Sequence, residues 1–270
     1  MRRLLLTVLA LLAFLPAASA ARTGESAAQV DSSALASLDG MVQRYADAIS
    51  QESFDAKQTE CDFLITSVTD TLLRTHIANR LFDIYRNSRV MGDEQVAIYL
   101  WDNWFKDHKL EMPSEDAWFD ARLYADFNRN TLLGCPAPVL RLRKPCGGRL
   151  NTPQKGKASL MYFYETNCGK CKLESKVLPS VMKEVDRPVV FYAIYVGSDK
   201  KAWAEFRKNF KFSNPKVKVV HLWDPDDETD LLRLYGVLST PKLYAIKSDG
   251  LVAGRRLELE NILQILPYLD

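Results

Sequence analysis

Two cysteines separated by two residues are the part of this sequence best suited to chemistry. The motif comprises Cys168, Gly169, Lys170 and Cys171. It follows an apolar, aromatic-rich run that begins at Leu160, and such a run predicts a buried strand that leads into a helix. Both sulfurs would then lie at the helix N-terminus, where unpaired backbone N–H groups and the helix dipole favour a thiolate. This setting predicts thiol-disulfide redox chemistry.

An inert structural disulfide and half of a zinc site are the alternatives for such a pair. A four-ligand zinc site needs a second pair of Cys or His ligands at suitable spacing. The three histidines, at positions 76, 108 and 221, are scattered singly, and no second Cys-x-x-Cys occurs in the sequence. We therefore expect a redox-active dithiol that works without a metal or any other cofactor.

The first twenty residues are typical of a secretory signal peptide. Arg2 and Arg3 precede an apolar run that is too short to span a bilayer, and small residues then lead to Ala20. We expect cleavage after Ala20; the alternative, an uncleaved membrane anchor, is disfavoured by these small residues. The sequence has no cysteine before Cys61, so we do not expect a lipoprotein.

The charge of the chain is balanced. It has 36 Lys and Arg against 34 Asp and Glu, and loss of Arg2 and Arg3 with the leader leaves 34 of each. This balance gives no reason to expect nucleic acid or an anionic membrane as a partner. Five cysteines are few for an exported disulfide-stapled scaffold, so burial of apolar side chains must hold the folded chain together.

The first half of the mature chain is predicted to be helical. Residues 21–33 have the small, polar composition of a mobile leader, and residues 34–133 keep helical spacing of their apolar side chains. We expect helices near residues 35–49, 63–73, 77–85, 93–104 and 113–127. This small all-α domain carries no recognisable chemistry; it would serve for dimerisation, for substrate presentation or as support.

The second half, residues 134–270, alternates strands and helices. A basic hairpin over residues 139–152 is followed by a parallel strand-helix-strand unit, a strand over 217–222, an antiparallel pair over 242–252 and a terminal helix. We expect Ser198 to cap one helix, and the acidic residues 226–228 to open another that Gly236 closes. Together these elements predict an α/β sandwich with a mixed sheet.

Residues 134–270 resemble the TlpA/ResA-like branch of the thioredoxin superfamily. The resemblance rests on Gly-x-Pro-Ala-Pro at 134–138, on the Cys-Gly-Lys-Cys motif after a strand, on Glu174, and on residues 235–241, Tyr-Gly-Val-Leu-Ser-Thr-Pro. The preceding helical region looks like the accessory domain of exported two-domain members from Gram-negative anaerobes. The resemblance implies a thioredoxin-like sandwich and a thiol-disulfide oxidoreductase in the periplasm.

The resemblance also implies roles for individual residues. Cys168 would attack a substrate disulfide and Cys171 would resolve the mixed disulfide that results. Gly169 would leave the approach open, and Lys170 would help to hold the thiolate or would be simply a solvated lysine. Pro241 is expected to be a cis-proline that faces the sulfurs. The backbone of the neighbouring residue, Thr240, would pair with an extended substrate segment.

Three positions depart from the family pattern. Asn167 replaces the tryptophan that commonly precedes the first cysteine, Lys170 replaces a frequent proline, and Tyr162 occupies the strand position of a buried acid. Another group must therefore accept the proton of Cys171. Glu174 and Glu165 are the candidates, and each of them is equally open to being a surface carboxylate.

Several functions agree with these residues. The leading hypothesis is a reductant or isomerase that acts on protein thiols and disulfides and draws electrons from a membrane donor. The oligomeric state is left open by the sequence; a homodimer through the helical domain would favour isomerase work by presenting two sites to one client. The alternatives are a net oxidant, a redox-inactive binding module, and copper delivery through the two motif cysteines with His221. Cys61, Cys135 and Cys146 are predicted to be free thiols or to include a Cys135–Cys146 disulfide.

Overall fold

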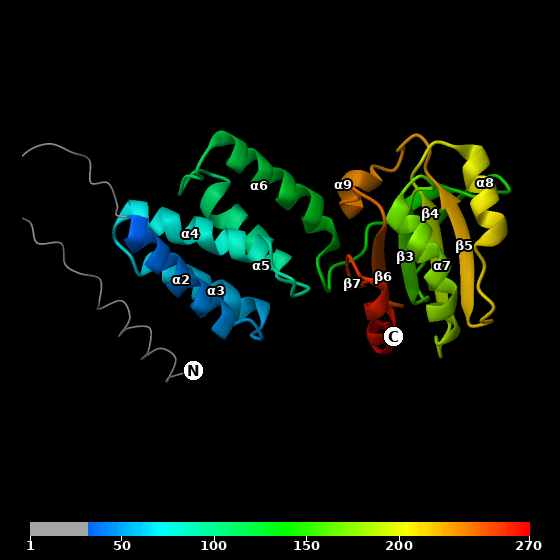
Figure 1. Ribbon diagram of the computed structural model, residues 1–270, viewed down its shortest axis with the longest axis horizontal. Helices are drawn as coiled ribbons and strands as arrows, with labels where there is room; N and C mark the ends of the chain where they lie inside the picture. The colour runs from blue at the N-terminus through cyan, green and yellow to red at the C-terminus, as the bar shows by residue number, and fades with distance from the viewer. Residues whose placement is uncertain (1–31) are drawn as a thin grey trace, which may run out of the picture. The chain divides into compact units, whose positions relative to one another are not determined.

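The computed structural model describes residues 32–270, so the expected signal peptide and most of the leader lie outside the described residues. Leu38–Asp270 forms one compact unit. In this unit a helical segment comes first and a sheet with flanking helices follows it in the chain (Figure 1). Among the described residues no helix is long and apolar enough to cross a membrane.

The helical segment has a core of its own. Its largest fully buried side chains include Phe82, Phe105 and Leu81, and the rings of Phe82 and Phe105 meet edge to face. The elements are α2 (Ser32–Ala48), α3 (Phe54–Thr66), α4 (Thr71–Arg86), α5 (Glu94–Leu100), the π-helical turn η1 (Trp101–Phe105), α6 (Glu115–Asn128) and the 3-10 turn η2 (Arg129–Thr131). These elements confirm the prediction that a helical segment precedes the sheet.

The predicted boundaries of the second and third helices are wrong. Helices are expected near residues 63–73 and 77–85, but α3 spans Phe54–Thr66 and α4 spans Thr71–Arg86, so the break lies at residues 67–70 and not between 73 and 77. Asp70 starts the new helix, because its side chain accepts a hydrogen bond from the N–H of Leu73 at 2.9 Å. Apolar spacing continues across the short break, so periodicity alone does not reveal it.

The sheet has seven strands in the order β2-β1-β5-β4-β3-β6-β7. The strands are β1 (Leu140–Arg143), β2 (Arg149–Thr152), β3 (Ser159–Tyr164), β4 (Val189–Tyr195), β5 (Val217–Trp223), β6 (Lys242–Ile246) and β7 (Val252–Gly254). β3 pairs in parallel with β4 and antiparallel with β6, so the sheet is mixed. All six residues of β3 are buried, which confirms the predicted central strand before the cysteine motif.

Helices cover both faces of this sheet. One face packs against α7 (Gly169–Lys183), α8 (Lys200–Asn209) and the C-terminal elements η3 (Leu259–Asn261), α10 (Ile262–Ile265) and η4 (Leu266–Tyr268). The other face packs against α9 (Leu231–Tyr235). Alternate residues of β3 supply the two cores: Tyr162 faces the α7 side and Phe163 faces the α9 side. The predicted α/β sandwich is confirmed.

Two helix starts differ from expectation. Asp199, and not Ser198, caps α8, because its Oδ1 accepts hydrogen bonds from the N–H groups of Lys201 and Ala202 at 2.8 and 3.0 Å. Helix α9 begins at Leu231, after the acidic residues 226–228 that were expected to open it. An aspartate carboxylate is a good N-cap, and here it displaces the serine next to it.

The acidic residues before α9 have another role. Arg143 donates to Asp226 at 2.7 Å and to Glu228 at 2.6 Å, and Arg149 also forms an ion pair with Glu228. These pairs join the β1–β2 hairpin to the segment after β5. The charge of the basic hairpin is therefore partly neutralised within the chain.

Candidate active site

Helix α7 positions the two motif cysteines. Cys168 is its N-cap, and its sulfur accepts a hydrogen bond from the N–H of Cys171 at 3.1 Å. The two residues are joined by a disulfide, with their Cα atoms 5.2 Å apart. Cys168 is partly exposed, whereas Cys171 is only 2% exposed. One sulfur of the pair can therefore be reached from solvent and the other is shielded.

The residues next to Cys168 leave its sulfur accessible. Gly169 is exposed, and a Cβ atom at that position would have no neighbouring atom within 4 Å. Asn167, the residue before Cys168, is exposed as well. Because residue 167 is asparagine and not tryptophan, no aromatic ring from this position covers the sulfur of Cys168.

The loop before β6 lies against the disulfide. The Sγ atom of Cys168 is 3.3 Å from the carbonyl oxygen of Thr240, although the two residues are 72 positions apart. The Thr240–Pro241 peptide bond is cis. Both residues are partly buried. The structure thus brings together the motif and the loop that the resemblance pairs with it.

Glu174 lies one helical turn beyond Cys171, on the interior side of α7. It is 9% exposed, and burial raises the pKa of its carboxyl group, while Lys170 and the Tyr162 hydroxyl act to lower it. The pKa of Tyr162 is itself raised, mainly by burial and then by the charge of Glu174. Glu165, the other candidate, is partly exposed at the end of β3. Of the two carboxylates, Glu174 is the one held in a buried environment.

Lys170 does not act on the sulfurs as an isolated charge. Its ammonium nitrogen lies 2.8 and 3.1 Å from the two carboxylate oxygens of Glu258 and 3.6 Å from Glu174. These carboxylates raise the pKa of Lys170, with the Glu258 hydrogen bond as the largest cause. The positive charge of the motif is therefore shared between two acids.

The three remaining cysteines are free. Cys61 is fully buried in the helical core, Cys135 is partly exposed, and Cys146 is exposed in the turn between β1 and β2. The alternative of a Cys135–Cys146 disulfide is therefore wrong. Pairing requires two Cα atoms close together with Cβ vectors that converge, and closeness in sequence across a hairpin does not ensure this.

The copper-delivery alternative finds no support in the geometry. His221 packs against the rings of Phe206 and Phe210, and burial lowers its pKa to about 4. Among residues 32–270 no group of three or more Cys, His, Asp or Glu side chains is arranged to hold a metal ion. His221 is instead a neutral ring within an aromatic cluster.

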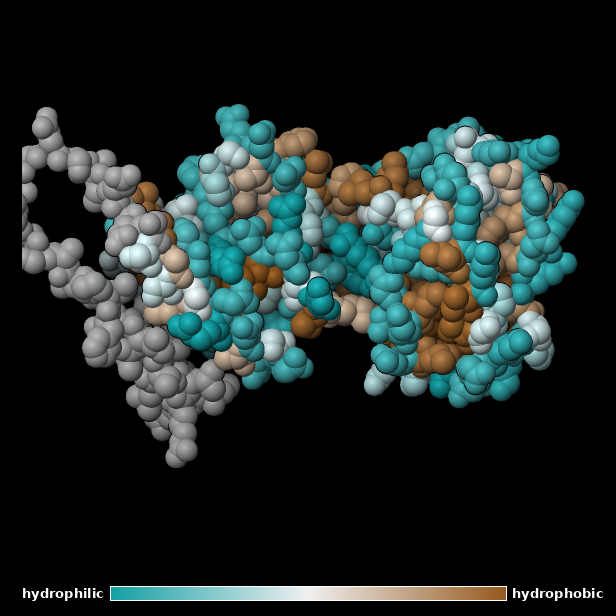
Figure 2. Space-filling view, in the orientation of Figure 1, coloured by the Kyte–Doolittle hydropathy of each residue, from teal (hydrophilic) through white to brown (hydrophobic). Residues whose placement is uncertain are grey.

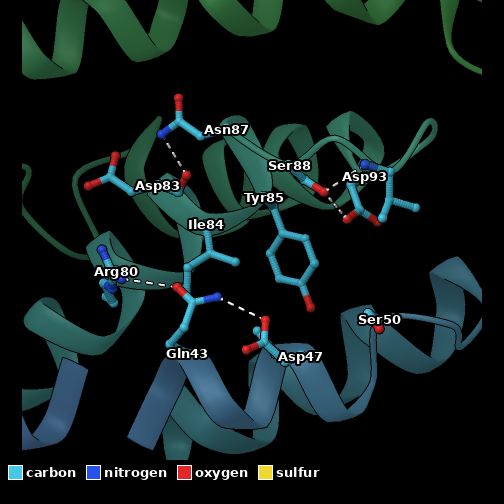
Figure 3. Close-up of a pocket in the computed structure, with 12 residues that line it drawn as sticks. Gln43, Asp47, Ser50, Arg80, Asp83, Ile84, Tyr85, Asn87, Ser88 and Asp93 are labelled. Atoms are coloured by element: carbon cyan, nitrogen blue, oxygen red, sulfur yellow. Dashed lines mark hydrogen bonds between the residues drawn. The ribbon is translucent and has the colours of Figure 1, made fainter. Parts of the chain in front are cut away.

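A separate pocket of about 440 Å³ lies between α2 and α4 (Figure 3). Its polar groups bond to one another: Arg80 donates to Gln43, Gln43 donates to Asp47, and Ser88 donates to Asp93. No cysteine lines it. This pocket therefore lacks the cysteines on which thiol-disulfide exchange depends.

Comparison with known proteins bears on the fold. No protein-family model matches the chain, and no curated protein matches it. Among solved structures, a thioredoxin-like protein from Bacteroides caccae aligns with a TM-score of 0.64 at 14% identity, covering 87% of this chain and 84% of that one. The chain has a thioredoxin-like fold.

Shorter matches to solved structures also occur. One is a domain of a possible thiol-disulfide isomerase from Cytophaga hutchinsonii, with a TM-score of 0.43 and 21% identity over 51% of this chain and 92% of that one. Another is a thiol-disulfide oxidoreductase from Bacteroides fragilis, with a TM-score of 0.43 and 18% identity over 50% of this chain and 99% of that one.

Three charged residues beside the Cys-Gly-Lys-Cys motif were not predicted from the sequence. Lys242, Arg256 and Glu258 line a small cavity that also includes Lys170, Glu174 and Pro241. Lys242 directly follows Pro241, so the sequence already indicated that Lys242 lies next to the Thr240–Pro241 loop. Arg256 and Glu258 come from the turn after β7, and no local pattern connects that turn to the motif.

Proposed function

We propose that this protein is an exported thiol-disulfide oxidoreductase that exchanges disulfides with protein substrates. One observation carries the proposal: a disulfide at the start of α7 has a partly exposed first sulfur, at Cys168, and a buried second sulfur, at Cys171. An inert structural disulfide has no need of this asymmetry, whereas thiol-disulfide exchange requires one reachable sulfur and one protected partner. The thioredoxin-like fold agrees with this activity.

The first step uses the helix terminus. In the reduced protein the Cys168 thiolate would be stabilised by the N–H of Cys171, which already donates to its sulfur, and by the positive end of the α7 dipole. The thiolate attacks one sulfur of a substrate disulfide. A new bond forms between Cys168 and that sulfur, the substrate bond breaks, and the other substrate sulfur leaves as a thiolate.

The second step uses the buried cysteine. Cys171 loses its proton to a nearby base and attacks the sulfur of Cys168, which releases the second substrate sulfur as a thiolate and restores the internal disulfide. The substrate gains two electrons and the protein loses two. Glu174 is the base we assign, because its carboxyl group is buried three residues along the same helix and its raised pKa makes it a better proton acceptor near neutral pH.

Substrate contact would come from three surfaces around Cys168. The backbone of Thr240 can pair with an extended segment, as in strand addition to a sheet edge. A groove of about 800 Å³ opens between α7 and α8 beside Asn167. Apolar side chains also gather on the surface over α7, where Leu173 and Val177 are exposed (Figure 2). Such surfaces suit clients that expose apolar segments before they have folded fully.

We place the activity in the periplasm, in the reducing or isomerising direction. Support for export comes from the first twenty residues, with their basic start, apolar run and small-residue step at Ala20. In that compartment a membrane electron donor would keep the dithiol reduced. A homodimer formed through the helical segment would present two such sites to one client.

The activity is tested by reduction of insulin disulfides in the presence of an external thiol. The wild-type chain is expected to accelerate this reaction, and Cys168→Ser is expected to reduce the rate to that of the thiol alone. Equal rates for both proteins would leave the redox-inactive binding module as the function. A measured reduction potential of the Cys168–Cys171 couple then separates a reductant from a net oxidant.

The clients themselves can be captured. In a Cys171→Ala variant the second step cannot occur, so mixed disulfides through Cys168 should accumulate and identify the substrates. A Cys168→Ala, Cys171→Ala double variant is the matched control, because it keeps the same fold and lacks the attacking sulfur. Species captured equally by both variants are not exchange substrates.

A further inference from the structure

A small charged cavity lies behind the active-site loop. Its volume is about 80 Å³, which has room for a few water molecules. Pro241 borders it, and three separate segments supply its charged side chains. These are Lys170 and Glu174 from α7, Lys242 from the start of β6, and Arg256 and Glu258 from the turn after β7.

Glu258 is fixed in place beside this cavity by its backbone. The N–H of Leu257 donates to the carbonyl oxygen of Leu243 in β6 at 2.9 Å, and the N–H of Asn261 donates to the carbonyl oxygen of Glu258 at 3.1 Å. The carboxylate therefore meets Lys170 from a turn that is anchored to the sheet. Both oxygens of Glu258 lie within 3.1 Å of the ammonium nitrogen of Lys170.

Two carboxylates thus share one ammonium group. Glu174 lies 3.6 Å from the nitrogen of Lys170, and Glu258 lies 2.8 Å from it. The shorter contact belongs to Glu258, so Lys170 is drawn away from a full ion pair with Glu174. The groups that face Glu174 are Lys170 on its own helix, Tyr162 from β3, Lys242 from β6, and Arg256 and Glu258 from the turn.

We propose that Glu258 is a positioning residue for the redox pair: by holding Lys170, it keeps the Glu174 carboxylate available to accept the proton of Cys171. The inference rests on the proposed function, in which Cys171 loses its proton before attacking. The proton passes from the Cys171 sulfur to a carboxylate oxygen of Glu174, and the electron pair left on the sulfur forms the new bond to Cys168.

The direction of the effect follows from the contacts. The negative charge of Glu258 acts to raise the pKa of Glu174, and the positive charge of Lys170 acts to lower it. Glu258→Gln removes the negative charge that raises the pKa of Glu174, and it frees Lys170 to pair with Glu174. Both changes make Glu174 a weaker base. Lys170→Gln removes the positive charge that lowers the pKa of Glu174, so it makes Glu174 a stronger base. The two substitutions should therefore act in opposite directions.

The test follows the resolving step at different pH values. Reduced protein is mixed with a fluorescent disulfide peptide, and decay of the mixed disulfide is recorded from acid to alkaline pH. We expect Glu258→Gln to move the acid limb of this profile to lower pH by about half a unit and Lys170→Gln to move it upward. Shifts this modest are expected because Lys170 and Glu258 are 53% and 59% exposed, and solvent screens their charges.

Glu260→Gln is the matched control. Glu260 is exposed, carries the same charge, lies two residues further along the chain and does not line the cavity. Opposite shifts for the two cavity variants with no shift for Glu260→Gln support the inference. An unshifted Glu258→Gln, shifts of the same sign in both cavity variants, or an equal shift in the control would overturn it. If the wild-type chain does not exchange at all, the proposed function is refuted as well.

Discussion

The substitution Asp93→Asn tests a buried ion pair in the helical segment. The ammonium nitrogen of Lys57 lies 2.6 Å from Asp93 Oδ1, and the two side chains are only 6% and 8% exposed. Ser88 donates to the other carboxylate oxygen at 2.6 Å. Asp93 lies at the edge of the pocket in Figure 3, where its bond to Ser88 is visible. The pair links α3 to the residue that precedes α5.

The magnitude follows from this burial. Removal of one partner from a buried pair typically costs about 3–5 kcal/mol, because a charge is left without compensation away from water. Asparagine has nearly the same shape as aspartate, and its amide oxygen can still accept one hydrogen bond. We therefore expect the free energy of unfolding to fall by about 3 kcal/mol, the lower end of that range. Urea denaturation followed by circular dichroism measures this change.

An exposed pair of equal length provides the control. Arg233 donates to Asp230 at 2.6 Å, and these side chains are 59% and 49% exposed. Asp230→Asn makes the same chemical change in water, and asparagine tolerates the left-handed backbone of this position. Its cost should stay below about 1 kcal/mol. A loss at Asp93 no larger than the loss at Asp230 would refute the argument that burial makes the Lys57 pair important.

Three further predictions concern a glycine, a histidine and the free thiols. Gly236→Ala should lower stability by at least about 2 kcal/mol in a thermal melt, because φ is +56° and a Cβ atom would lie 2.5 Å from the carbonyl oxygen of Phe127. Burial lowers the pKa of His221 to about 4 in the folded protein, whereas an unfolded chain protonates this histidine near its ordinary pKa of about 6.5. Between these pH values, protonation of His221 therefore favours the unfolded state. About 2–3 kcal/mol of stability should therefore be lost between those pH values, and His221→Phe should remove that part of the pH dependence. Finally, a water-soluble maleimide should label the exposed Cys146 rapidly in the folded protein and spare Cys61, because Cys61 is buried and burial raises the pKa of its thiol to about 12. Mass spectrometry measures the labelling of each cysteine, and rapid labelling of both would contradict the structure.

Local sequence was enough to predict the strand and the helix that position the two motif cysteines. A strand of six buried residues, the turn to Cys168 and the helix that follows are set by hydrophobic pattern and by the geometry of a helix start. The difference in burial between Cys168 and Cys171 agrees with their places along α7. Both lie on the same helix face, but Cys168 is the N-cap at the open end of the helix, and Cys171 lies one turn further in, where it packs in the core. The strand and the helix start depend on neighbours in the chain, and the structure has them as predicted.

Contacts between distant segments were decided only by the tertiary structure. The sequence alone left Glu174 and Glu165 as equal candidates, and packing against β3 is what buries Glu174. The partner of Lys170 proved to be Glu258, which is 88 residues away, and no periodicity relates the two. The free state of Cys146 is likewise a matter of where the hairpin directs its side chain. Hydrophobic pattern determines which face of an element is buried, but the identity of a charged neighbour depends on how separate elements pack against one another.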